Sequence, residues 1–471
     1  MPNGQRDYLA EYDAAPPNQQ YLLARGWMQT EPLPFFKQLR AERPILVTPE
    51  CTMVSLYSDL TDVMQMPKVF TVDLYKPKMG VTATEVGYLM AHDDDALHYR
   101  EKSLMQGLLN RDDIPRIRAM VEKTARKILD DADGSIEIVN QYCRMVPAHL
   151  VQDYFGLDGV YREDLIEWSY WNQYDAFHNQ PFDLNPPEES QYIIKRHDEV
   201  TEKLRAYIGL LMLRKSIVVA IGNVIRFLLA PLRLIRQLMC RLLRCQPVVR
   251  PSKDDIVKRL LRSKFAKEVD LPLVRVGVNA GGLLIGSIET TSQAVAQVIE
   301  FFLVHRTDLL PEIKEKAELD DPTAFDSMVW EALRFAPISP YMFRQASTDT
   351  VIAKGTGRST LVRARTNVLL LSQSAMFDTY AYDDPETFNS DRNWYHHFNF
   401  GFGSHECLGK YVGMVMIPEM VRQVMLRNNI SGEGAITRRN GALYGNGPGA
   451  GKDGPFPEEF NLSWQKGPSW Q

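Results

Sequence analysis

One cysteine of the chain lies in a setting that suits metal chemistry. The segment FGFGSHECLG, residues 400–409, places Cys407 after a glycine-rich loop and before an apolar stretch with helical spacing. Backbone amides and the helix dipole stabilise a thiolate at such a position, and Gly401, Gly403 and Gly409 let the backbone approach a flat ligand closely. The pattern predicts a sulfur ligand to a metal. The alternative is a buried structural cysteine, the usual role of a lone cysteine.

A second group lies in a long apolar segment, residues 271–305, whose length and small residues predict a buried central helix. It contains the neighbours Glu289 and Thr290, and an acid beside an alcohol can relay protons. The alternative is a threonine bonded to its own helix carbonyl and a glutamate facing solvent. If Glu289 and Thr290 stood alone, we would prefer this alternative. Because the chain also contains the cysteine loop, we prefer the proton relay.

The elements that must position these residues are mostly helical. Residues 95–215 repeat apolar residues at helical spacing, 345–371 read as strands, and 376–405 are rich in turns. An apolar helix follows Cys407, and a glycine-rich tail begins at Ser431. The sequence predicts a mainly α fold with a small β portion, as one domain over residues 1–471.

Composition narrows the class of protein. The chain has 471 residues, 45% of them hydrophobic, and a net charge of -5, so nothing points to nucleic acid. Five cysteines, an odd count, argue against a disulfide framework and for a reducing compartment. We find no secretory signal and no uninterrupted membrane span. We therefore expect a cytoplasmic enzyme.

Residues 216–250 differ from the rest of the chain. Their sequence is apolar and basic, with Arg226, Arg233 and Arg236 among Leu, Ile, Val and Phe. This composition is typical of an amphipathic helix at an anionic lipid surface. Three alternatives stay open: peripheral membrane contact, a packed surface helix pair with solvated arginines, or a docking site for a partner. Pro231 would break or kink a single helix.

The cysteine loop resembles the heme-binding loop of the cytochrome P450 superfamily. The match covers Phe400, Gly401, Gly403, His405, Cys407 and Gly409. The resemblance implies heme b, with Cys407 as the thiolate ligand of the heme iron and His405 as a donor to a heme propionate. The chain resembles the soluble bacterial members of this superfamily most. Compact members have no counterpart of residues 216–250.

Other segments match the family in the same order along the chain. Glu331 and Arg334 resemble its Glu-x-x-Arg helix, and Arg392 lies in a segment that resembles its meander. Alone, a helical Glu–Arg pair is usually a solvated ion pair. The resemblance implies a structural network of one carboxylate between two guanidiniums, which supports heme retention.

Further matches concern oxygen and the propionates. GSIETT, residues 286–291, resembles the oxygen-activating motif, with Ser287 replacing a glycine, and this implies a catalytic relay by Glu289 and Thr290. His98 and Lys102 resemble a propionate-binding His-x-x-x-Arg helix, although lysine lacks the arginine fork. Either Lys102 pairs as a point charge, or Arg100 replaces it. Arg344 matches a second propionate arginine.

The implied activity is a monooxygenase reaction on a lipophilic small molecule, of the fatty acid, terpenoid or steroid class. It would use O2 and electrons from a separate ferredoxin or flavodoxin, because the sequence shows no flavin or iron–sulfur motif. The rival is an electron-independent heme-thiolate isomerase or peroxygenase that acts on a lipid hydroperoxide. Such enzymes often lack the acid–alcohol pair, which Glu289 and Thr290 provide. A non-catalytic heme sensor or carrier is the least favoured alternative.

Overall fold

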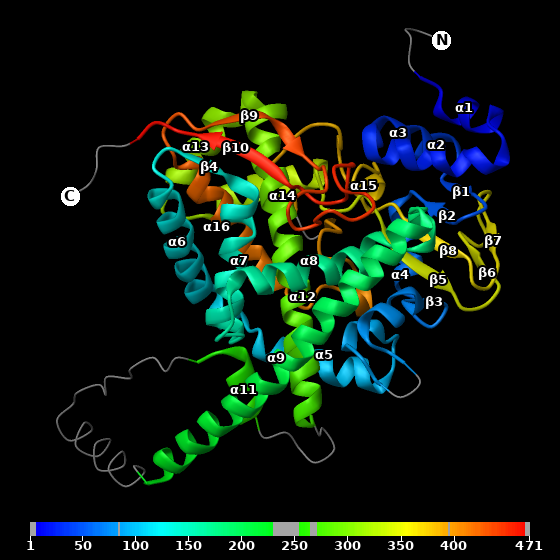
Figure 1. Cartoon of the computed structure of the whole chain (residues 1–471). Helices are drawn as coiled ribbons and strands as arrows, with labels where there is room; N and C mark the ends of the chain where they lie inside the picture. Colours follow the sequence, from blue (N-terminus) through cyan, green and yellow to red (C-terminus); the bar gives the residue numbers. More distant parts are fainter. Residues whose placement is uncertain (1–5, 83–84, 229–253, 264–270, 394–395, 467–471) are drawn as a thin grey trace, which may run out of the picture.

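The computed structural model describes residues 6–82, 85–228, 254–263, 271–393 and 396–466. Helices make up most of this part of the chain and surround one long helix, α12, while the sheets are small and lie at the periphery (Figure 1). The prediction of a mainly α fold with a small β portion is confirmed.

The α-helices make up most of the described structure. They are α1 (Tyr8–Ala14), α2 (Pro17–Thr30), α3 (Pro32–Glu42), α4 (Tyr57–Met64), α5 (Ala96–Leu108), α6 (Ile114–Asp131), α7 (Met145–Leu150), α8 (Arg162–His178), α9 (Pro187–Leu228), α11 (Ile256–Arg262), α12 (Leu273–Glu300), α13 (Leu310–Glu318), α14 (Thr323–Phe335), α15 (Ser372–Ala375) and α16 (Lys410–Met425).

Helix α12 is the central element. It begins after Pro272, whose fixed φ suits a helix start, and runs to Glu300. It contacts α8, α9, α14 and α16 along its length. Most of its side chains are buried, because a helix that is apolar on nearly all sides is stable only inside a core. The predicted buried helix within residues 271–305 is therefore present.

Three sheets flank the helices. The largest has the strand order β1-β2-β8-β5-β3, the second β4-β10-β9, and the third is the β6–β7 hairpin. Among the strands of the described residues, only β2 and β8 pair in parallel, with Thr52 opposite Val368. The strands are β1 (Ile45–Val47), β2 (Thr52–Val54), β3 (Phe70–Thr71), β4 (Ser135–Glu137), β5 (Met342–Ala346), β6 (Thr350–Ile352), β7 (Thr360–Val362), β8 (Asn367–Leu370), β9 (Ser431–Thr437) and β10 (Glu459–Ser463).

The cysteine loop is a tight structure that leads into α16. Gly401 and Gly403 both have φ near +70°, which favours glycine. A Cβ on Gly403 would also lie 3.1 Å from the carbonyl oxygen of Met64. The loop thus needs glycine at both positions. The final helix begins at Lys410, three residues after Cys407.

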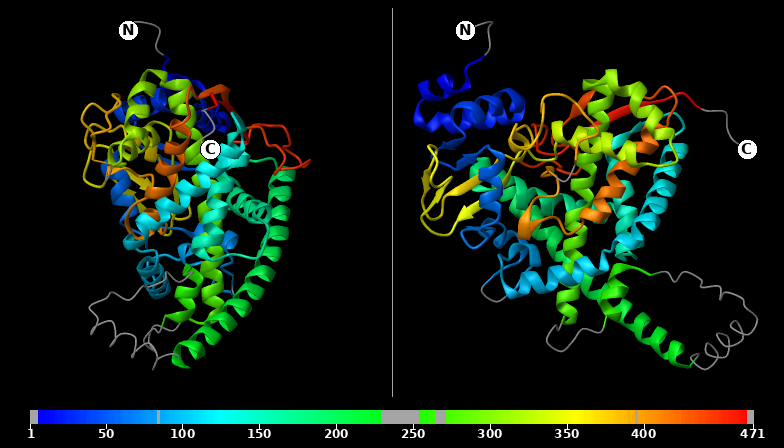
Figure 2. Two further views of the ribbon diagram at one scale, coloured as in Figure 1. Left: turned by 90° about the vertical axis from the view of Figure 1, so that its left-hand side faces the viewer. Right: turned by 180° about the vertical axis from the view of Figure 1, so that it is seen from behind.

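Helix α9 includes the first part of the basic apolar segment, residues 216–228. It runs without a break from Pro187 to Leu228, so residues 216–228 continue a long helix instead of beginning a separate insertion. Its distal part projects from the body in all three views (Figures 1 and 2). Residues 229–253, with Pro231, Arg233 and Arg236, lie outside the described residues.

By length and composition, Pro187–Ile225 is apolar enough to cross a membrane, and 22% of its most apolar window is buried. The sequence predicts no uninterrupted span, and this helix meets the requirement by length and composition only. Arg214 and Lys215 interrupt the apolar run in sequence, but the helix continues through them.

Candidate active site around Cys407

The Cys407 thiol faces a space inside the protein. The residue is exposed by accessible area, yet burial is the largest influence on its thiol and raises the pKa. A side chain that is open and still surrounded by protein must face an internal space instead of bulk water. The Gly409 amide and the charge of Lys102 oppose the effect of burial and favour the thiolate.

One face of α12 lies across from this thiol. Tyr88 lies near both. Its ring fills the position where a Cβ on Gly282 of α12 would stand. Burial raises the pKa of the Tyr88 hydroxyl, and the nearby Cys407 thiol raises it further. One turn further along α12, a Cβ on Gly286 would meet nothing within 4 Å. Gly286 is exposed and Thr290 half-buried, so this face of α12 is open.

Thr290 and Glu289, although adjacent, have different surroundings. The Thr290 hydroxyl donates to the carbonyl oxygen of Gly286 at 2.7 Å. Glu289 is fully buried and accepts from Arg144, with Nε to Oε1 at 2.7 Å and Nη2 to Oε2 at 3.3 Å. Arg144 also lies 3.4 Å from Glu458, which accepts a hydrogen bond from Tyr170. The predicted relay acid is thus held in a buried ion-pair network.

Two buried side chains near the loop have no hydrogen bond to an anionic side chain among the described residues. Arg344 is 7% exposed, and in the described part of the chain its guanidinium donates only to the carbonyl oxygen of Phe343. Burial lowers its pKa. His405 Nε2 is buried without a hydrogen bond among the described residues, 3.7 Å from Asp93. Burial lowers the pKa of His405 to about 4, so the ring is neutral at pH 7 and still has one N–H to donate.

A buried unpaired guanidinium is costly unless an anion joins it. Arg344 and His405, beside a thiol that opens onto an internal space, therefore fit a planar group that carries carboxylates and a metal. Heme b has these features. The donor set is consistent with this cofactor, with sulfur from Cys407 and propionate contacts from Arg344 and His405.

His98 and Lys102, the other predicted propionate residues, bind the cysteine loop itself. The two ring nitrogens of His98 lie 3.0 Å from the carbonyl oxygens of Leu89 and Ser404. Lys102 donates to the carbonyl oxygens of Ser404 and Glu406, the latter at 2.7 Å. Arg100 stays half-exposed beside Glu101. A lysine ammonium can satisfy several carbonyls at once, which explains why Lys102 is directed at the loop.

Phe400 and Gly401 shape the other end of the loop. The carbonyl oxygen of Phe400 accepts the Cys407 amide at 2.7 Å, which fixes the turn that presents the thiol. The Phe400 ring packs on Trp330 with centroids 5.2 Å apart. It also lies against Gly413 of α16, where a Cβ would stand 3.0 Å from the ring.

Glu331, Arg334 and Arg392 meet in one buried network. Glu331 accepts from Arg334 at 2.7 and 3.0 Å and from Arg392 at 3.3 Å. Arg334 is fully buried and also donates to the carbonyl oxygens of Met376 and Pro385. The network joins α14 to the meander that precedes the cysteine loop, as a structural role requires.

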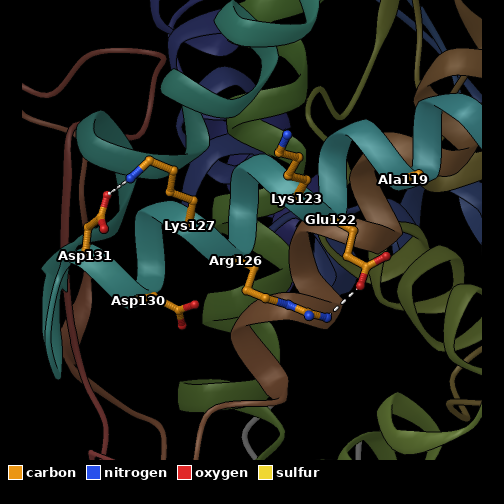
Figure 3. A pocket seen from close by; sticks show the side chains of 7 residues that line it. All are labelled: Ala119, Glu122, Lys123, Arg126, Lys127, Asp130 and Asp131. Carbon is orange, nitrogen blue, oxygen red and sulfur yellow. Dashed lines mark hydrogen bonds and ion pairs between the residues drawn. The ribbon is translucent and has the colours of Figure 1, made fainter. Parts of the chain in front are cut away.

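A hollow on the surface of α6 lies apart from this site (Figure 3). Its lining is one helix face with the ion pairs Arg126–Glu122 and Lys127–Asp131, all well exposed. Exposed i,i+4 ion pairs of this kind are solvated and weak. This hollow cannot hold a flat apolar cofactor.

Two residues of the site, Arg144 and Tyr88, could not be identified from the sequence. Arg144 stands in no local motif, and its contact with Glu289 joins residues far apart in the chain. Tyr88 lies in an irregular segment before η3 (Leu89–Ala91). Neither position carries a periodic or spacing signal, so only the folded structure identifies them.

Comparison with known proteins gives the same family from two directions. The family model "Cytochrome P450" matches residues 244–431. A steroid C26-monooxygenase of Mycolicibacterium smegmatis is 32% identical over 145 residues, 31% of this chain and 33% of that protein. The alignment thus spans about a third of that relative's length. The cytochrome P450 YjiB of Bacillus subtilis is 22% identical and covers 80% of this chain and 82% of its own.

Solved structures share the fold over nearly the whole chain. Cytochrome P450 CYP109Q5 from Chondromyces apiculatus superposes with a TM-score of 0.67 at 17% identity, covering 93% of this chain and 96% of that chain. CYP109E1 from Bacillus megaterium, in complex with testosterone, gives a TM-score of 0.67 at 17% identity, with coverage of 93% and 98%. Residues 244–431 match the cytochrome P450 family, whose members bind heme b through a cysteine thiolate, and nearly the whole chain has the fold of these enzymes.

Proposed function

We propose that this protein is a monooxygenase that inserts one oxygen atom of O2 into a lipophilic small molecule. The observation that carries the proposal is the Cys407 thiol, which opens onto an internal space across from the open face of α12. A thiolate ligand on one side and a small residue with an alcohol on the other are the parts that oxygen activation needs.

Each residue of the site has its own role in the proposed reaction. Substrate, O2, two electrons and two protons give hydroxylated substrate and water, and bound heme supplies the activation of O2. Cys407 donates the sulfur ligand, Arg344 neutralises a propionate, and the neutral His405 ring donates a hydrogen bond to a propionate. Thr290 holds a hydroxyl proton at the open face of α12, 2.7 Å from the Gly286 carbonyl. Glu289 completes the proposed relay when it separates from Arg144.

The substrate class follows from the chemistry of the surroundings. The core around α12 is apolar, with Ala280, Leu283 and Leu284 buried on it, and a dry apolar pocket favours a lipophilic ligand. The name of the M. smegmatis relative and the testosterone bound to CYP109E1 support the steroid class among fatty acids, terpenoids and steroids. The proposed electron donor is a separate ferredoxin or flavodoxin.

The location of the protein is part of the same proposal. Its structural relatives include the bacterial enzymes CYP109Q5 and CYP109B1. We expect a cytoplasmic protein, with peripheral membrane contact through residues 216–250.

Turnover under two regimes tests the activity. The heme-loaded protein is mixed with a steroid, fatty acid or terpenoid panel, first selected by substrate-induced spin shift. We expect hydroxylated product with O2 and a ferredoxin or flavodoxin system, and none without reductant. Product formed from a lipid hydroperoxide without reductant or O2 would contradict the proposal.

That second outcome would support a heme-thiolate isomerase or peroxygenase. Two observations favour this rival. A bifunctional dioxygenase–epoxy alcohol synthase of Pyricularia oryzae is 22% identical over 83% of this chain and 34% of its own. Glu289, moreover, is bound to Arg144. Retention of Thr290 on the open face of α12 favours the monooxygenase.

A further inference from the structure

The distal part of α9 exposes a continuous apolar stripe. Its members recur at three- and four-residue spacing, so they share one face of the helix. They are Leu210 (70% exposed), Leu213 (60%), Ile217 (51%), Ile221 (55%), Val224 (60%) and Leu228 (67%). Phe227, at 80%, is exposed beside them. Beyond Val219 no described residue of α9 is buried. Such a continuous patch on a projecting helix is unusual for a surface that meets only water.

A second element adds to this apolar surface. At the start of α12, Leu273 is 48% exposed and Val274 69% exposed. The start of α12 and the end of α9 extend toward the same side of the molecule, the lower side in Figures 1 and 2. The opposite face of α9 is anchored to the protein, because Lys215 is buried and bonds to Asp255 at 2.9 Å. The stripe is therefore held outward.

The charge of the segment selects the partner. From residue 216 to residue 253 the sequence contains seven lysines and arginines and no aspartate or glutamate. The preceding Arg205, Arg214 and Lys215 are not counted, because they pair with acidic side chains of the protein. The chain as a whole has a net charge of -5, so this excess of positive charge is local. Apolar side chains combined with arginines and lysines, without acids, are complementary to a bilayer that has an apolar acyl-chain region and negatively charged headgroups.

We propose that the distal part of α9 and the start of α12 form a docking surface for an anionic lipid bilayer. The apolar stripe lies in the boundary between headgroups and acyl chains, and the net positive charge of the sequence from residue 216 to residue 253 attracts the negative headgroups. The helix lies in the interface and does not cross the bilayer, because Lys215 and the buried face of α9 hold it to the protein.

The docking surface is continuous with the active site through α12. Val274 lies in the first turn of that helix and Gly286 twelve residues later, about 18 Å along the axis at 1.5 Å per residue. A lipophilic substrate dissolved in the bilayer would thus reach the open face of α12 from the membrane side. This consequence rests on the proposed function, whereas the docking surface does not.

Flotation of the full-length protein with liposomes tests the proposal. We expect binding to vesicles of phosphatidylcholine with phosphatidylglycerol, and much weaker binding to pure phosphatidylcholine or in high salt. The triple variant Ile217→Ser, Ile221→Ser, Val224→Ser should bind about tenfold less or weaker, because three half-exposed apolar side chains no longer enter the bilayer.

The control variant is Leu22→Ser, Val47→Ser, Leu361→Ser, whose side chains are 51%, 56% and 49% exposed but lie outside α9 and α12. It should bind like the parent protein. Circular dichroism and heme content should match in all three proteins, so a loss of binding is separated from unfolding and from loss of the proposed activity.

Three outcomes would overturn the proposal. Equal flotation on neutral vesicles at any salt concentration would exclude the role of the positive charge. A concentration-dependent dimer that the triple variant abolishes, without vesicle binding, would show that a second copy covers the stripe. Resistance of the membrane-bound protein to extraction with alkaline carbonate would show a spanning helix instead of a surface one.

Discussion

At the scale of single residues, Glu289 and Thr290 are neighbours with opposite environments. Thr290 is half-buried at the open face of α12, and Glu289 is fully buried against Arg144. We expect Thr290→Ala to fold normally and to form about tenfold less product per electron pair, since the hydroxyl proton is lost and general acid catalysis is typically worth at least that much. Reductant consumption and product are measured together, and unchanged coupling would place the proton path elsewhere.

Glu289 should behave differently from its neighbour. Glu289→Gln leaves Arg144 fully buried with Glu458, at 3.4 Å, as its remaining carboxylate. Disruption of a buried ion pair costs about 3–5 kcal/mol, so the free energy of unfolding in urea should fall by about that amount. Thr290→Ala, which removes one hydroxyl, should cost about 1 kcal/mol. Equal stability of the two variants would show that the Arg144 contact contributes little.

The same two residues show what a sequence can and cannot predict. The identities of Cys407, Thr290 and Glu331 are visible in local motifs, because short spacings on a loop or helix fix their neighbours. The partner of Glu289 is not visible, because Arg144 is distant in the chain. The sequence leaves open whether Lys102 or Arg100 pairs with a propionate. In the structure Lys102 donates to loop carbonyls, a contact that depends on backbone positions unknown from the sequence.

At the scale of elements, the network of Glu331 ties α14 to the meander. Glu331→Gln should lower the free energy of unfolding by about 3–5 kcal/mol, because Arg334 is fully buried and loses its carboxylate. The heme content of the purified protein should fall with it. The matched control is Glu312→Gln, which breaks the exposed Glu312–Lys316 pair of α13 and should cost below about 0.5 kcal/mol. Similar losses in both variants would argue against the structural role of the buried network.

The turn between α8 and α9 provides a pH prediction. Burial raises the pKa of Asp183 to about 6 from an ordinary value of 3.8. The folded state therefore binds the proton more tightly, and stability is lost as the pH rises from about 3.8 to about 6. Asp183→Asn keeps an acceptor for the Gln180 amide and removes the charge. Relative to the parent, it should gain up to about 3 kcal/mol at pH 7 and little at pH 4. The same difference at both pH values would contradict this origin.

Elements were predictable where periodicity was strong. The length and apolar content of residues 271–305 predicted α12, since a long apolar helix has one stable place, inside the core. The course of residues 216–228 was not predictable. Their composition suggested a separate insertion, whereas the backbone continues α9 through Arg214 and Lys215. Within this continuous helix Lys215 bonds to buried Asp255, which lies forty residues away, and a contact at that separation has no signal in the local sequence.

At the scale of the whole molecule, the active site, the buried Glu331 network and the exposed apolar surface are all connected to the central helix α12 or to the segment that carries Cys407. Helix α12 presents an open face across from Cys407, and the structural network of Glu331 secures the segment before the cysteine loop. The apolar surface of α9 and α12 lies at one end of the same central helix. The central claim is that Cys407 is the thiolate ligand of a heme.

The carbon monoxide spectrum of the reduced protein tests this claim most directly. The parent protein should show the red-shifted Soret band of a thiolate-bound heme. Cys407→Ala should lack it, whereas Cys51→Ala, at a buried cysteine of another core cluster, should retain it. Heme content determined separately distinguishes a lost ligand from a lost cofactor. A thiolate-type Soret band that persists in Cys407→Ala would contradict the account.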